Sequence, residues 1–121
     1  MLALVLDDSR AMRSILTRTM TRFGFDVETA ADGAEGLELV RRGPLPDVVL
    51  IDWNMPVMTG LEFVSQVRNT PVWRGITLMM VTAETDQCDI VRALTAGAHE
   101  YVTKPFTAEV IGDKLRLLGL V

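Results

Sequence analysis

Cysteine, histidine and lysine are scarce in this 121-residue sequence, which contains one, one and two of them. The single Cys88 cannot form a disulfide within the chain, so the sequence favours a reducing compartment and we expect a cytoplasmic protein. The chain also lacks a basic start followed by an apolar segment and a small-residue cleavage site, which argues against secretion. Its longest apolar runs fall well short of the ~20 residues that a membrane helix needs, so we expect no membrane association.

The composition is that of a globular protein, with 49% hydrophobic and 23% charged residues. A chain of this length buries roughly two-thirds of its unfolded surface, which is enough for one core. No repeat, low-complexity tract or linker interrupts the sequence, so we expect residues 1–121 to form a single domain with no second domain. The formal net charge of −4 argues against direct binding of nucleic acid, which needs clustered cations.

Basic residues are nevertheless concentrated in one segment. Residues 10–22 contain four arginines and no acidic residue, the arginines being Arg10, Arg13, Arg18 and Arg22. Two interpretations stay open, a solvated helix face and a docking surface for an acidic partner.

Short apolar runs, typical of strands, alternate along the chain with apolar stripes at spacings of three and four, typical of helices. The predicted strands are residues 2–8, 26–30, 47–52, 76–83 and 99–103, and the predicted helices are residues 9–24, 32–42, 59–68, 85–97 and 107–118. Five such alternations predict a parallel sheet with helices on both faces, because parallel strands need crossover connections.

Each predicted helix has start signals and an inward face. Ser9 and Asp32 are candidate N-caps, Thr59 with Glu62 forms a candidate capping box, and Thr85 with Asp86 suits the start of the fourth helix. The residues predicted to face inward are Met12, Ile15, Leu16, Met20, Phe23, Leu37, Val40, Phe63, Val64, Val67, Ile90, Val91, Leu94, Val110, Ile111 and Leu115.

Polar residues follow four of the predicted strands at their carboxyl ends, where the functional crevice of such sheets lies. They are Asp7 and Asp8 after the first strand, Asp52 after the third, Thr82 and Ala83 at the end of the fourth, and Lys104 after the fifth. Three carboxylates in one place repel each other unless a cation lies among them. Oxygen ligands in a water-accessible site favour Mg²⁺.

This arrangement suits phosphoryl transfer to a carboxylate. With Mg²⁺ and the Lys104 ammonium neutralising the incoming oxygens, Asp52 could attack a phosphoryl group and form an acyl phosphate, while the Thr82 hydroxyl binds another phosphoryl oxygen. A single Asp at a strand end is usually a turn or helix cap. Capping does not, however, require all four strand ends to carry this combination.

Four motifs resemble one family in order and spacing across the whole chain. They are "LDDS" (6–9), "DWNMP" (52–56), "VTAE" (81–84) and "YVTKPF" (101–106). The chain resembles the receiver domain of two-component response regulators, and most of all the single-domain chemotaxis regulators of the CheY type. The resemblance implies a flavodoxin-like, doubly wound (βα)5 fold with strand order 2-1-3-4-5, an order already known for this family.

The same resemblance assigns roles at the site. It implies that Asp52 accepts a phosphoryl group from a phosphohistidine of a sensor histidine kinase or a histidine phosphotransfer protein. Asp8, Asp52 and the backbone carbonyl of Asn54 would hold Mg²⁺ directly, and Asp7 would reach it through water. Lys104 would pair with the phosphoryl oxygens, and its bond to Pro105 is expected to be cis.

Thr82 and Tyr101 would form the switch by this likeness. The Thr82 hydroxyl would move toward the phosphate, and the Tyr101 ring would then move inward. This would remodel the surface of the fourth helix, fifth strand and fifth helix, where partners bind. Asn54 and Glu84 resemble pairs found in short-lived regulators. Thr85, Asp86 and Gln87 stand where enteric-type regulators carry lysines, which puts the flagellar switch in doubt as the partner.

Two alternatives remain at this stage. The chain could be the receiver portion of a longer transcriptional regulator. It could also be a Mg²⁺-dependent phosphohydrolase of the haloacid-dehalogenase type, but those enzymes carry a second Asp where this chain has Asn54. We expect a binding module controlled by phosphorylation rather than an enzyme, with no output domain in these residues.

Overall fold

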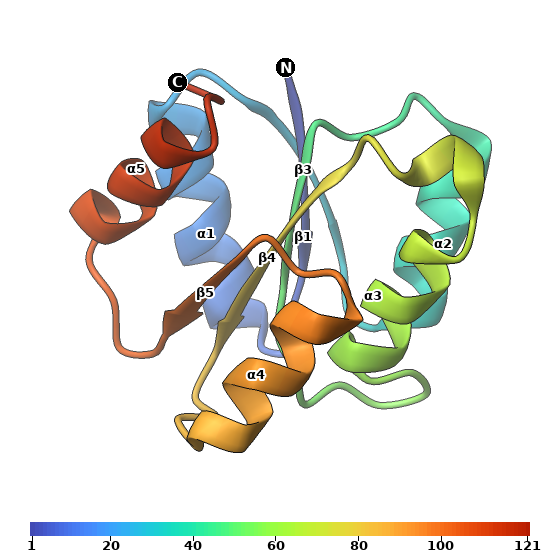
Figure 1. Ribbon diagram of the computed structural model, residues 1–121. Coiled ribbons are helices and arrows are strands. Elements are labelled where there is room, and N and C mark those ends of the chain that lie inside the picture. Colours follow the sequence, from blue (N-terminus) through green and yellow to red (C-terminus); the bar gives the residue numbers. More distant parts are fainter.

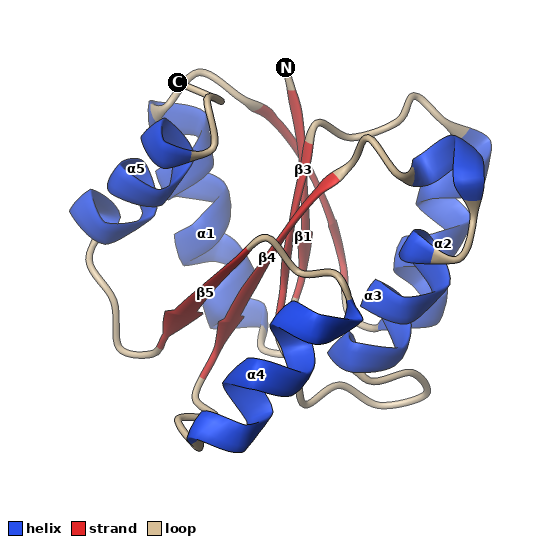
Figure 2. Cartoon of the chain, viewed as in Figure 1, coloured by secondary structure: helices blue, strands red, loops and turns tan.

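The computed structural model describes all 121 residues, and strands alternate strictly with helices along the chain (Figures 1 and 2). The strands are β1 (Leu2–Leu6), β2 (Asp26–Ala30), β3 (Val48–Ile51), β4 (Thr77–Thr82) and β5 (Glu100–Thr103). The helices are α1 (Arg10–Arg22), α2 (Gly33–Arg42), α3 (Gly60–Arg68), α4 (Gln87–Ala96) and α5 (Ala108–Leu117), with a 3₁₀ turn at Pro71–Trp73 that the sequence reading did not predict. None of the helices combines the length and the apolarity that a membrane span needs.

All five strands are parallel and lie in the order β2-β1-β3-β4-β5, which confirms the predicted flavodoxin-like fold. The register pairs Leu6 with Ile51 and Ile51 with Met80, so β1, β3 and β4 are aligned at their ends. The carboxyl ends of the strands therefore form one continuous edge, at the bottom of the view in Figure 1.

Helices cover both faces of the sheet. α1 and α5 pack on one face, and α2, α3 and α4 pack on the other (Figure 1). All four residues of β3 have no solvent exposure, which explains its unbroken apolar sequence, because a central parallel strand contacts helices on both sides. This rigid sheet fixes the residue that follows β3.

The helix starts match their predicted caps. The side chains of Ser9 and Asp32 each accept a hydrogen bond from a backbone N–H in the first turn. Thr107 caps α5 in the same way, although no cap was predicted there. Thr59 and Glu62 form the complete capping box. α4 begins one residue later than its first candidate, since Asp86 rather than Thr85 is the N-cap.

Four predicted inward positions are wrong. Ile15, Val91, Leu94 and Val110 are exposed by 48%, 56%, 44% and 39%. On α4 and α5 a narrower stripe makes the contact, because a small residue allows close approach: Ala93 is the only fully buried residue of α4, and Gly112 of α5 lies against the ring of Phe23. Apolar residues beside such a stripe remain in solvent, and three of these four lie on α4 and α5.

Candidate functional site

The aligned strand ends bring the predicted site residues together. The backbone N–H of Asp52 donates to Leu6 O at 2.9 Å, and that of Lys104 donates to Thr82 O at 2.9 Å. Sheet hydrogen bonding thus continues one residue beyond the strands. The positions of these functional side chains are therefore set by the sheet rather than by flexible loops.

Three carboxylates meet at this edge. Asp7, Asp8 and Asp52 each offer an oxygen, and these oxygens lie within 4.8 Å of one another. Asp7 and Asp52 are buried, whereas Asp8 is exposed and opens the cluster to water. A group of hard oxygen donors that reaches solvent fits a divalent cation such as Mg²⁺.

One cation from the chain faces these three acids. The Lys104 ammonium lies 2.7 Å from Asp7 Oδ2 and 3.3 Å from Asp52 Oδ2. Burial raises the pKa of Asp52, and the nearby Asp7 raises it further, while the Thr82 hydroxyl and Lys104 oppose the shift. Lys104 and the Thr82 hydroxyl therefore offset only part of the cost of burying an ionised Asp52.

The loop after Asp52 is held tightly against it. Gly60 donates its N–H to Trp53 O at 2.9 Å, and a Cβ on Gly60 would lie 2.3 Å from Asp52 O. Only glycine allows the start of α3 to approach so closely. Within this loop Val57 has φ 68° and is 83% exposed, a left-handed conformation that β-branched residues rarely adopt.

Glu84 joins three predicted site residues. Its backbone N–H lies 3.4 Å from Thr82 Oγ1, its backbone carbonyl accepts from Tyr101 Oη at 2.8 Å, and its carboxylate accepts from Asn54 Nδ2 at 2.5 Å. Thr82 is fully buried, while the neighbouring Ala83 is exposed. The loop after β4 therefore connects the end of β3 to β5.

Tyr101 is half-buried on β5. Burial raises the pKa of Tyr101 to about 12, with smaller contributions from the charges of Asp89, Glu84 and Asp52. The hydroxyl therefore keeps its proton at neutral pH and serves as a hydrogen-bond donor to the loop after β4.

Two features of the structure were not predicted from the sequence. The guanidinium of Arg92 on α4 lies 5.6 Å from the centre of the Trp53 ring, in a cation–π contact next to Asp52. Besides the Lys104–Pro105 bond, which is cis, the Gly43–Pro44 bond is cis as well. No spacing in the sequence signals the cation–π contact, because Trp53 lies in the loop after β3 and Arg92 lies on α4.

Comparison with known families agrees with this geometry. A model of the family described as "Response regulator receiver domain" matches residues 3–116. The chain belongs to the response regulator receiver domain family. This receiver domain is 42% identical to a chemotaxis protein CheY homolog of Campylobacter jejuni, over 93% of this chain and 87% of that protein. It is 39% identical to the chemotaxis protein CheY1 of Helicobacter pylori, over 95% and 94% of the two chains.

Solved structures give the same result. The chemotaxis response regulator CheY4 of Vibrio cholerae superposes with a TM-score of 0.88 at 36% identity, covering 97% of each chain. The protein is therefore a CheY-like receiver of two-component signalling, with the acidic triad Asp7, Asp8 and Asp52 at its site, and it is a signalling switch rather than an enzyme.

Proposed function

We propose that this receiver domain accepts a phosphoryl group on Asp52 from the phosphohistidine of a sensor histidine kinase or a histidine phosphotransfer protein. The observation that carries the proposal is the Lys104 ammonium between Asp7 and Asp52, inside a cluster of three carboxylates. A structural ion pair would need one carboxylate for one lysine. The excess of acids points to a missing positive charge.

Mg²⁺ is the cation that we propose for this site. Asp8, Asp52 and the carbonyl of Asn54 would hold it, with Asp7 in reach through water, and it would neutralise charge on the phosphoryl oxygens. The raised pKa of Asp52 supports this assignment, because a bound cation favours the ionised carboxylate that acts as nucleophile.

In the chemical step an Asp52 carboxylate oxygen attacks the phosphorus of the donor. The P–O bond to Asp52 forms, the P–N bond to the donor histidine breaks, and the imidazole keeps the electron pair and takes up a proton. Lys104, already 3.3 Å from Asp52 Oδ2, is placed to pair with an incoming phosphoryl oxygen. The buried Thr82 hydroxyl can donate to another.

The signal would leave the site through Glu84. Thr82 and Tyr101 both contact the backbone of Glu84, so a shift of the Thr82 hydroxyl toward the phosphoryl group alters the loop that Tyr101 binds. We propose that this changes the surface of α4, β5 and α5. The exposed Val91 and Leu94 on α4 and Val110 on α5 support that surface as a binding site for a downstream protein.

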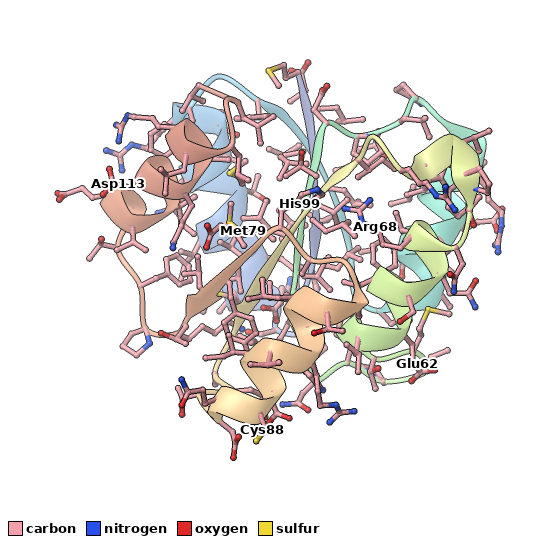
Figure 3. The ribbon with its side chains drawn as sticks, viewed as in Figure 1. Glu62, Arg68, Met79, Cys88, His99 and Asp113 are labelled. Carbon is pink, nitrogen blue, oxygen red and sulfur yellow. The ribbon has the colours of Figure 1, made fainter.

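Labelling with acetyl phosphate and Mg²⁺ tests the proposal. We expect one phosphoryl group per wild-type chain, and none on Asp52→Asn. The matched control is Asp113→Asn on α5, whose exposed carboxylate pairs only with Arg116 and points into solvent (Figure 3). Equal labelling of wild type and Asp52→Asn would refute Asp52 as the acceptor.

We further propose that residues 1–121 act as one receiver unit in the cytoplasm, which the single cysteine and the CheY relatives support. A signal passed on by protein contacts alone requires no DNA-binding segment. The full reading frame tests the alternative of a longer transcriptional regulator.

A further inference from the structure

The largest cavity of the molecule is an open surface depression between α1 and the edge strand β2, and one end of it reaches the backbone of Asp7. It measures about 620 Å³, within the size range of ligand pockets. Its lining contains only guanidinium and hydroxyl side chains, those of Arg10, Arg13, Ser14, Thr17, Arg18, Thr21, Arg22 and Thr29. We call this cavity the arginine pocket. It contains neither an acidic nor an apolar side chain.

The arginines of the pocket form no ion pair, unlike three arginines on other helices. Arg41, Arg92 and Arg116 each pair with a carboxylate three residues earlier on the same helix. α1 has no acidic residue at all, although the whole protein has a net charge of −4. Positive charge is therefore collected here without compensation from the chain.

This arrangement works against the helix that carries it. Arg10 and Arg13 lie in the first turn, where the helix dipole disfavours cations. Arg18 and Arg22 are four residues apart, so their like charges repel. A bound anion would offset both unfavourable interactions. A helix face that only contacts solvent gives no reason for this arrangement of charges.

The side chains of the pocket also supply hydrogen-bond donors. Arg13 Nη1 donates to Asp7 O at 2.7 Å, which fixes one guanidinium at the rim before any ligand arrives. The lining arginines, from Arg10 to Arg22, extend over about 18 Å of helix, and the hydroxyls of Ser14, Thr17 and Thr21 lie between them. Thr29 adds a hydroxyl from the opposite wall.

We propose that the arginine pocket binds a polyphosphate chain, either free or as part of a nucleotide. Guanidinium groups pair bidentately with phosphate, and hydroxyls donate to the remaining oxygens. An acidic protein surface is the alternative partner, but protein interfaces have apolar and aromatic residues at their core, and this pocket has none. This inference does not depend on phosphorylation of Asp52.

Binding is tested on the full chain with sodium tripolyphosphate and with ATP, by calorimetry and by ¹⁵N NMR titration. EDTA replaces Mg²⁺ in the buffer, so that the acidic site does not recruit metal-bound phosphate. We expect saturable binding at one site, with the largest shifts at the amides of Ser14, Thr17, Thr21 and Thr29. Affinity should fall steeply with salt, because phosphate contacts release counterions.

The decisive variant is Arg18→Gln with Arg22→Gln. Each lost charge-assisted contact should weaken binding about tenfold, so about 100-fold together. Removing the repulsion between them should leave the fold intact, which the melting temperature checks. The matched control, Arg41→Gln with Arg116→Gln, changes the net charge equally outside the pocket and should keep wild-type affinity.

The probes separate the possible sources. Equal affinity for tripolyphosphate and ATP indicates that the phosphate chain alone is bound, and tighter binding of ATP indicates a nucleotide. Equal affinity for a glutamate oligomer of the same charge would overturn the proposal, because the pocket would then bind any polyanion. An equal loss in the control pair, or no binding at all, would also overturn it.

Discussion

Two polar clusters lie at opposite ends of the sheet, and they differ in how far the chain itself satisfies their polar groups. At the amino ends of β4 and β5, the Arg68 side chain donates to the carbonyls of Gly97, Arg74 and Ile76 and lies beside His99 (Figure 3). At the carboxyl ends, three carboxylates share one ammonium, that of Lys104.

The difference separates a structural cluster from a functional one. Arg68 satisfies its donors within the chain, so its role is to tie the end of α4 and the loop before β4 to α3. The acidic edge stays incomplete without an added cation or phosphoryl group. A cluster of like charges that the chain leaves in excess is therefore the better indicator of chemistry.

Arg68→Met breaks the structural cluster and should have the largest effect on stability. Three backbone carbonyls lose their donor, which should lower the free energy of unfolding by about 3 kcal/mol. Urea denaturation measures it, with Arg41→Met as the control because that exposed ion pair contributes less than about 1 kcal/mol. The rate of labelling by acetyl phosphate should stay at the wild-type value; a large decrease would show that the two clusters are coupled.

Gly60→Ala tests the precision of the functional cluster. The new methyl group would contact Asp52 O, so the backbone of Asp52 must shift. A displacement of this kind should slow labelling about tenfold or more, since small misplacements of reacting atoms are costly. Gly75→Ala is the matched control, because nothing lies within 4 Å of its added Cβ. Equal labelling rates in the two variants would contradict tight positioning by the loop.

His99 gives the structural cluster a small pH dependence. Its Nδ1 accepts from the Leu78 N–H at 3.1 Å, and partial burial, together with Arg68, lowers the pKa of His99. The unfolded chain therefore binds this proton more readily than the folded chain. The contribution of neutral His99 to stability is fully present above about pH 6.5 and is lost as the pH falls toward the folded pKa.

The loss should be only a few tenths of a kcal/mol, because His99 is open to solvent. Melting curves of wild type and His99→Gln between pH 5 and 8 measure this loss as the difference in stability between the two proteins. The opposite pH trend from Asp52 is present in both proteins and cancels in the difference. If wild type instead gained stability relative to His99→Gln as the pH fell, the assigned sign would be wrong.

The sequence predicted the sheet, its order and the converging acids, because these depend on period, strand ends and motifs. It did not predict which apolar residues of α4 and α5 face solvent. That depends on how closely each helix packs on its neighbours: Ala93 is the one buried residue of α4, and Gly112 lets α5 approach the ring of Phe23. The roles of His99 and Arg68 were also missed, since their contact joins residues 31 positions apart.

The arginines of α1 are a second feature whose arrangement the sequence did not predict. Their lack of acidic neighbours is visible in the sequence, where a solvated face was the favoured interpretation and a docking surface the alternative. The pocket that they form with Thr29 depends on β2 lying at the edge of the sheet beside α1. Only the fold brings that strand and that helix together.

Thermal unfolding of wild type, Asp8→Asn and Arg68→Met during a Mg²⁺ titration tests most directly whether the acidic edge is the incomplete cluster. At 100 times its Kd, Mg²⁺ should stabilise wild type by about 2.7 kcal/mol, a rise in melting temperature of roughly 5–15 °C. Arg68→Met should show the same rise from a lower starting point, and Asp8→Asn should lose most of it. An absent rise in wild type, or an equal rise in Asp8→Asn, would contradict the account.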